Sequence, residues 1–187
     1  MRKFYFLLLI ICIFPQLIMA EGRNVGLDMF LIIDDSAALR EARSSVLAWV
    51  NDHVIDRILM EGDNITVWAA RDRAEIIYSG TISGQKEPVK SGISNLGASG
   101  SRADFTEALR DASGRASQVS RTSAERLAYT MLITASATGL EPVLTSAPGL
   151  IRWSRSLRYE GWQVLIINPG IEPRVREAAQ AYMNSRR

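Results

Sequence analysis

Apolar residues follow two different patterns in the first part of the chain beyond residue 24. Residues 25–33 end in an unbroken apolar run at 30–33, which is typical of a strand whose sheet is covered on both faces. Over residues 39–58 the spacing changes to three and four, which predicts a long amphipathic helix. The positions on its apolar face are Leu39, Ala42, Val46, Trp49, Val50, His53, Val54 and Ile58. The expected N-cap of this helix is Asp35 or Ser36.

Short strands and helices follow. Residues 65–70 and 74–79 are strand-like and close enough in sequence to pair as an antiparallel hairpin. Residues 88–97 begin with proline and end with glycine, which predicts a short helix. Asp104, followed three residues later by Glu107, resembles a capping box at the start of another helix.

The second half of the chain continues the alternation of helices and strands. The predicted elements are a helix with apolar positions Phe105, Ala108, Leu109, Ala112, Ala116 and Val119, a strand at 128–135, a helix at 148–159, a strand at 162–168 and a helix at 172–183. This order predicts an α/β fold with a Rossmann-like, doubly wound, mostly parallel sheet, one antiparallel edge strand and helices on both faces. Without an internal repeat or linker, residues 21–187 are expected to form a single domain.

The first twenty residues have the pattern of a signal peptide. Arg2 and Lys3 precede an apolar segment at 4–14, and a cleavage site follows at 18–20, so the mature chain is expected to begin at Glu21. The alternative is an uncleaved anchor, which the apolar stretch disfavours because it is shorter than the ~20 residues of a spanning helix. We therefore expect an exported protein that is not inserted in a membrane after cleavage.

Composition excludes several classes of function. Cys12 is the one cysteine, so residues 21–187 can form neither a disulfide framework nor a Cys-ligated zinc site. This favours a bacterial periplasmic location, with secretion as the alternative. Without Arg2 and Lys3, the 22 basic residues become 20 and equal the 20 acidic residues, so the net charge is zero. A net charge of zero gives no support for a nucleic-acid partner.

The end of the first predicted strand is the expected binding edge. In open α/β sheets, ligands bind outside the carboxyl ends of the strands, and Asp34, Asp35 and Ser36 lie at that point. These residue types also cap helices, so a structural role is the simpler alternative.

The element order, together with three strand or helix boundaries, resembles the von Willebrand factor A domain family over most of residues 25–183. The resemblance is carried by Asp34-Asp35-Ser36, by the following helix and hairpin, by the run Gly-Ser-Arg-Ala-Asp-Phe-Thr-Glu-Ala-Leu at 100–109, and by the strand at 129–134. It implies a Rossmann-like sheet. The resemblance also implies a possible metal site, because many members of the family hold a divalent metal at a metal-ion-dependent adhesion site. The ligands of that site are a D-x-S-x-S loop, a threonine and a strand-end aspartate.

This sequence matches that ligand set only in part. Asp34 and Ser36 fill the first two positions of the loop, but Ala38, Ala103 and Ala135 stand at the other three. Mg²⁺ prefers near-octahedral oxygen ligands, so the loss of three oxygens predicts no specific metal site and no cofactor. Rearranged ligands are the alternative, and the oxygens available in nearby sequence belong to Asp35, Ser101, Asp104 and Ser136.

Enzymatic motifs are absent from the sequence. It has no G-x-S-x-G elbow, Walker A loop or H-E-x-x-H pair, and His53 lies in a helical apolar stripe. A second possible surface consists of Arg152, Trp153, Arg155 and Arg158 on the predicted helix at 148–159, because arginine and aromatic residues are enriched at binding hot spots. The alternative for this stripe is a solvated helix face.

We therefore expect a non-enzymatic, exported module that binds another protein at a degenerate adhesion-site edge. The expected partner-binding residues are Asp34, Asp35, Ser36, Arg102, Asp104 and Ser136. Arg102 is included as a cation that offsets the carboxylates. The alternatives are a metal-dependent adhesion domain with rearranged ligands and a Rossmann-like hydrolase or nucleotide-binding enzyme.

Overall fold

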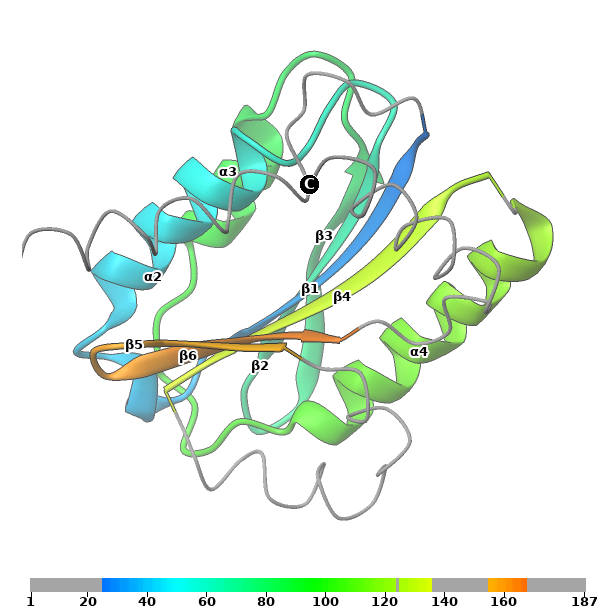
Figure 1. The fold of residues 1–187 in the computed structure, drawn as a ribbon. Coiled ribbons are helices and arrows are strands. Elements are labelled where there is room, and N and C mark those ends of the chain that lie inside the picture. Colours follow the sequence, from blue (N-terminus) through cyan, green and yellow to red (C-terminus); the bar gives the residue numbers. More distant parts are fainter. Residues whose placement is uncertain (1–24, 124, 136–154, 168–187) are drawn as a thin grey trace, which may run out of the picture.

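A computed structural model describes residues 25–123, 125–135 and 155–167 of the chain (Figure 1). The described strands form one six-stranded sheet in the order β3-β2-β1-β4-β6-β5. Their bounds are β1 Leu27–Asp34, β2 Asn64–Ala70, β3 Ala74–Thr81, β4 Leu127–Thr134, β5 Arg155–Tyr159 and β6 Trp162–Ile167. The helical elements are η1 Ala37–Leu39, α2 Arg43–Trp49, the π-helix η2 Val50–Ile55, α3 Glu87–Ser94 and α4 Phe105–Thr122.

The centre of the sheet is parallel. β1 pairs in parallel with β2 on one side and with β4 on the other, and β3 returns antiparallel to β2 as the predicted hairpin. The end of β1 is therefore a topological switch point, where the chain connections of neighbouring strands run to opposite sides of the sheet. This confirms the expected α/β fold class and its antiparallel edge strand β3.

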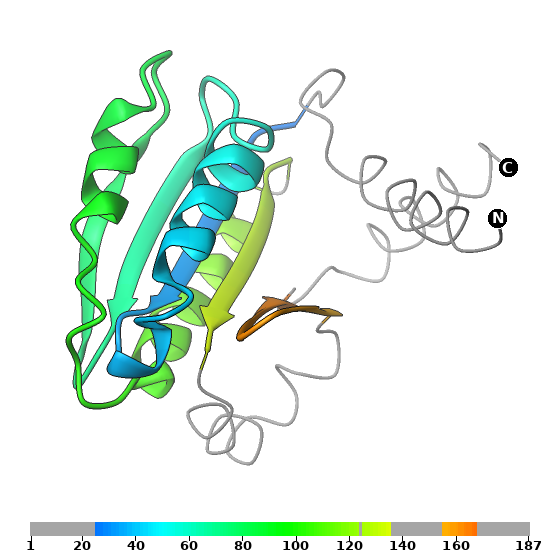
Figure 2. The same ribbon diagram turned by 90° about the vertical axis from the view of Figure 1, so that its left-hand side faces the viewer.

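Helices cover both faces of the sheet. α2 and α3 lie on one face, and α4 lies on the other (Figures 1 and 2). Strand residues alternate between the two cores as a pleated strand requires: Leu31 and Ile33 pack with α2 and α3, whereas Phe30 and Ile32 pack with α4. Because both faces are buried, β1 is fully buried along its whole length, as its unbroken apolar run predicts.

The helix after β1 is less regular than predicted. The stripe at three- and four-residue spacing is real, and Leu39, Val46, Val50 and Val54 are completely buried. However, the segment is divided among η1, α2 and η2. The expected side-chain cap is wrong, because Ser36 precedes η1 without forming a side-chain cap hydrogen bond.

The predicted helix at 148–159 is wrong over its described part, because Arg155–Tyr159 is strand β5. β5 and β6 form a hairpin, and β6 pairs antiparallel with β4, so this flank of the sheet is antiparallel instead of parallel. The turn is possible because Gly161 adopts a φ of 78°, which suits a tight hairpin connection.

Several predictions fall outside the described residues: the signal peptide at 1–20, Ser136, the first part of the helix at 148–159, and the helix at 172–183. Within the described part of the chain, no helix has the length and apolar character needed to span a membrane.

Candidate functional site

The candidate site is the carboxyl edge of the parallel strands, where three loops meet. Asp35 follows β1, and its N–H donates to the carbonyl of Ala70 at the end of β2. Ser36 forms a parallel β-bridge with Gly100 in the loop before α4, and Gly100 N donates a hydrogen bond to Asp35 O. A Cβ at Gly100 would lie 2.6 Å from the Cβ of Arg71, so this close approach of the loops requires glycine.

The carboxylate of Asp34 is buried and bonded entirely within the protein. Its Oδ1 accepts a hydrogen bond from Ser36 N at 2.9 Å. Its Oδ2 accepts from Thr134 Oγ1 at 2.8 Å and from Ala135 N at 3.3 Å. Asp34 therefore ties the end of β1 to the end of β4 and shapes the turn that follows it, instead of capping the long helix.

Asp35 is buried as well, but its two oxygens have different surroundings. Oδ1 accepts a hydrogen bond from Ala98 N at 2.7 Å, and Oδ2 lies 3.7 Å from Nε of Arg71. The guanidinium that offsets this carboxylate is thus Arg71 in the β2–β3 turn. Arg102 was the expected cation, but its side chain is exposed and forms no ion pair with Asp34 or Asp35 among the described residues.

Asp104 caps α4, as predicted. Its side chain accepts a hydrogen bond from Thr106 N at 3.0 Å. The second half of the capping box is not formed, because Glu107 accepts from Ala74 N at 3.4 Å and the N–H of Asp104 donates to the carbonyl of Arg71. The cap is thereby joined to the β2–β3 turn.

The exposed pair Ser101 and Asp72 lies at this edge, and the sequence had singled out Ser101 alone. The hydroxyl of Ser101 donates a hydrogen bond to Asp72, and the N–H of Ser101 adds a longer one. These bonds, the hydroxyl first, hold the pKa of Asp72 below its ordinary value. The topology offered a signal, since the turn after β2 must lie at the same edge as the end of the parallel strand β1.

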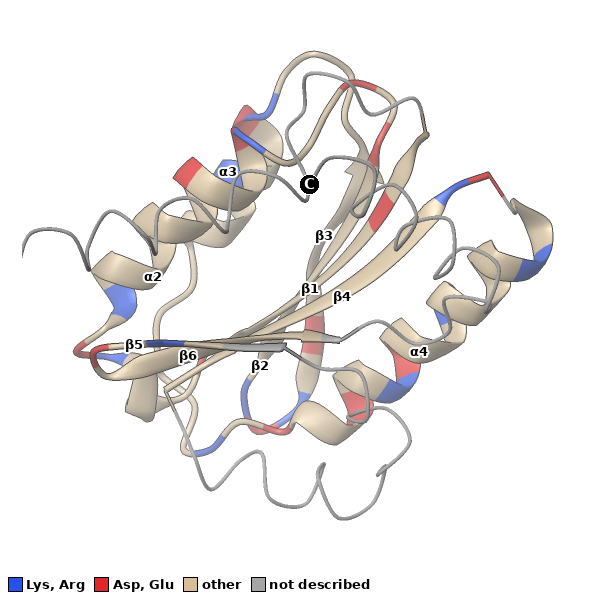
Figure 3. Cartoon of the chain, viewed as in Figure 1, with Lys and Arg blue, Asp and Glu red and all other residues tan. Residues whose placement is uncertain are grey.

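The expected partner-binding residues therefore have different accessibilities. Asp34, Asp35 and Ser36 are 0%, 1% and 2% exposed, so they position the loops and contribute almost nothing to the outer surface. Acidic and basic residues both occur on the loops around them (Figure 3). Among the described residues, no group of three or more His, Cys, Asp or Glu side chains is arranged to hold a metal.

No family model matches the sequence, and no curated protein matches it. Among solved structures, the chain is similar to a protein described as von Willebrand factor type A from Catenulispora acidiphila. The match has a probability of 1.00, a TM-score of 0.41 and 18% sequence identity, and it covers 56% of this chain and 25% of that chain. The chain spans about a quarter of the length of the protein that it matches.

The second predicted surface does not form as a helical stripe over its described part. Arg155 and Arg158 are in β5, and a spacing of three residues does not define one face of a strand. Arg152 and Trp153 lie outside the described residues. Next to Arg158, Tyr159 stacks on Trp162 with ring centroids 4.1 Å apart, and burial raises the pKa of the Tyr159 hydroxyl.

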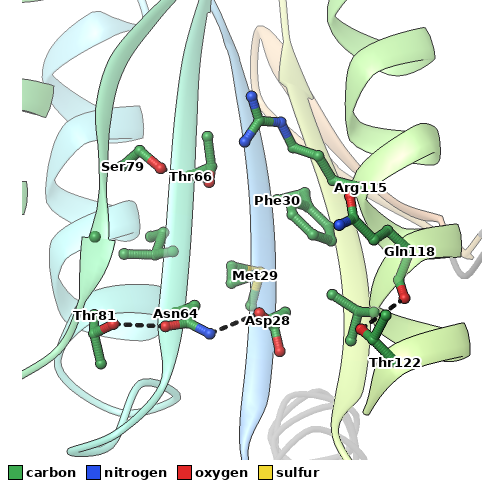
Figure 4. Close-up of a pocket in the computed structure, with 13 residues that line it drawn as sticks. Asp28, Met29, Phe30, Asn64, Thr66, Ser79, Thr81, Arg115, Gln118 and Thr122 are labelled. Atoms are coloured by element: carbon green, nitrogen blue, oxygen red, sulfur yellow. Dashed lines mark hydrogen bonds between the residues drawn. The ribbon is translucent and has the colours of Figure 1, made fainter. Parts of the chain in front are cut away.

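A polar cavity of about 290 Å³ lies between the sheet and α4, at the opposite end of the strands (Figure 4). Thr81 donates to Asn64, which donates to Asp28, and the other oxygen of Asp28 accepts from Arg126. Because these polar side chains form hydrogen bonds with one another, the structure of the sheet accounts for their presence in the cavity, and they indicate no ligand.

Proposed function

We propose that this chain is an exported, non-enzymatic module that binds another protein through the loops at the carboxyl edge of its vWA-like fold, without a bound metal. The general role of an interaction module fits the fold. Export is supported by the signal-peptide pattern at residues 1–20, and the absence of catalytic motifs in the sequence supports a non-enzymatic role.

The observation that carries the metal-free proposal is the bonding of Asp34. Both of its oxygens accept hydrogen bonds from protein donors, so the carboxylate is stabilised without a cation. At the aligned family positions, Ala38, Ala103 and Ala135 contribute methyl groups where oxygen ligands would be needed. Exposed residues of these loops that can contact a partner include Ala37, Ala38, Asp72, Ser101 and Arg102, and Arg71 is partly exposed.

Divalent cations test the metal-free part of the proposal. We expect that millimolar Mg²⁺, Ca²⁺ or Mn²⁺, added after treatment with EDTA, leaves the melting temperature unchanged. The reason is that a ligand stabilises a protein only if it binds the native state. The measurement is differential scanning calorimetry with each cation. A saturable rise for one cation that is lost in Asp34→Ala would instead support the adhesion-site alternative.

Capture from the native cells tests the interaction. The full chain with a C-terminal tag is cross-linked in its own cells, purified and analysed by mass spectrometry. We expect a partner protein to be enriched, and the captured chain to begin at Glu21. Ala38→Arg, which places a bulky charge on the exposed loop, should reduce the captured partner by more than about fivefold, since buried unpaired charge in an interface is costly.

Ser83→Arg is the matched control for that variant. It adds the same side chain at an exposed position beyond the end of β3, at the other edge of the sheet. Equal capture by both variants and the unmodified chain would contradict the proposed binding edge.

A further inference from the structure

A cavity of about 270 Å³ lies beside the partner-facing loops, between the beginning of β3 and the end of α3. We call it the Asp35 pocket. Its apolar lining includes Ile77 and Leu96, which belong to the core on the α3 side of the sheet, and its charged residues are Asp35, Arg71 and Glu75. At ~30 Å³ per water, the volume corresponds to about nine waters, which is enough for one long side chain.

A buried carboxylate in this pocket retains a hydrogen-bond acceptor. The side chain of Asp35 is 2% exposed, and its Oδ1 is bonded to Ala98 N. Oδ2 is 3.7 Å from Arg71 Nε, which is too far for a hydrogen bond, and it accepts none from the described part of the chain. A carboxylate oxygen with only a loose ion pair can accept a further hydrogen bond, and the largely buried surroundings of the side chain strengthen such a bond.

The balance of charge decides which kind of donor fits. Two carboxylates and one guanidinium line the pocket, so it carries one net negative charge at neutral pH. Nη2 of Arg71 already donates to Glu75 Oε2 at 2.6 Å, and Nε faces Asp35. Arg71 is therefore engaged with both carboxylates, and an incoming cation is favoured over an incoming anion.

We propose that the Asp35 pocket binds a basic side chain, arginine or lysine, of the protein partner. The inference rests on the proposed function and names the chemistry of the partner. The aliphatic stem of the basic side chain lies along Ile77 and Leu96, as long cationic side chains commonly cover apolar surface. Its cationic end donates to Asp35 Oδ2 and to the exposed carboxylate of Glu75.

Small probes test the pocket without the partner. N-butylguanidinium is titrated into the isotope-labelled protein, and the methyl resonances of Ile77 and Leu96 are followed by NMR. We expect saturable shifts centred on these two residues. Butyrate has an alkyl chain of similar length and the opposite charge, and we expect it to produce no saturable shift there.

Glu75→Gln keeps the shape of a side chain that lines the pocket and removes one charge. We expect it to weaken N-butylguanidinium binding by about two- to fivefold, the range for an exposed ion pair. Glu61→Gln is the matched control, because it makes the same change at an exposed turn outside the pocket, and it should leave binding unchanged.

Three results would overturn the inference: no saturable shift with N-butylguanidinium, equal shifts with butyrate, or equal weakening by both variants. The test is independent of partner capture. Failure of the probes with successful capture would reject the basic side chain and leave the proposed function intact. Probe binding without any captured partner would reject the function and leave the pocket.

Discussion

Asp34→Ala is expected to lower the free energy of unfolding by about 3 kcal/mol. The substitution removes the acceptor for Ser36 N, Thr134 Oγ1 and Ala135 N at a fully buried position. A buried donor left without its partner costs about 1–3 kcal/mol, and hydrogen bonds to a charged acceptor are at the strong end of the scale. The measurement is urea unfolding followed by tryptophan fluorescence in EDTA.

Two variants calibrate that result. Asp34→Asn keeps one carbonyl acceptor but turns an NH₂ group toward donors, so it should lose a smaller part of the stability. Asp104→Ala removes the N-cap of α4 at the same edge and should cost about 1 kcal/mol. If Asp34 instead served a metal, Asp34→Ala without cations would be neutral or stabilising, because it would relieve repulsion with Asp35. A neutral result would therefore contradict our account of the carboxylate.

Ile32→Ala and Leu132→Ala are each expected to cost about 2–5 kcal/mol. Both side chains are completely buried, and they are partners in the register of the central parallel strands β1 and β4. They belong to the core beneath α4, where truncation loses transfer free energy and leaves a cavity. Because the two residues are neighbours, the double variant should not equal the sum of the single variants. Urea unfolding at equilibrium provides the free energies.

Ile76→Ala is the control for these core substitutions. It makes the same change as Ile32→Ala on a strand of the same sheet, but Ile76 is 42% exposed. A loss within about 0.5 kcal/mol is expected there. If both core variants also lost less than that, β1 and β4 would not be the centre of the sheet.

Local patterns in the sequence predicted much of the fold. The unbroken apolar run at 30–33 predicted a buried strand because both faces of a central parallel strand need apolar side chains. The β2–β3 hairpin, α3 and the cap of α4 were predicted for the same reason, since each depends on residues close together in the chain. The alternation of strands and helices likewise predicted the α/β class with a parallel centre of the sheet, which the structure shows.

The β5–β6 hairpin could not be predicted from local pattern. Arg155 and Arg158 have a spacing that suits a helix, but the segment forms a strand because β6 is available to pair with it across the Gly161 turn. Tyr159 and Trp162 then stack, and Trp49 packs on Trp162 with ring centroids 5.7 Å apart. Pairing and stacking between strands override the helical preference of a short segment.

The sequence by itself placed two carboxylates at the carboxyl edge of a Rossmann-like sheet. It also showed alanine at three positions where the resemblance implies metal ligands. Only the tertiary structure decided what those carboxylates bind. Asp34 meets Thr134, which is 100 residues away, and Asp35 meets Ala98 and Arg71 from two other loops. Such partners depend on how strands stack side by side and how closely loops approach at Gly100, and neither is encoded in the spacing of neighbouring residues.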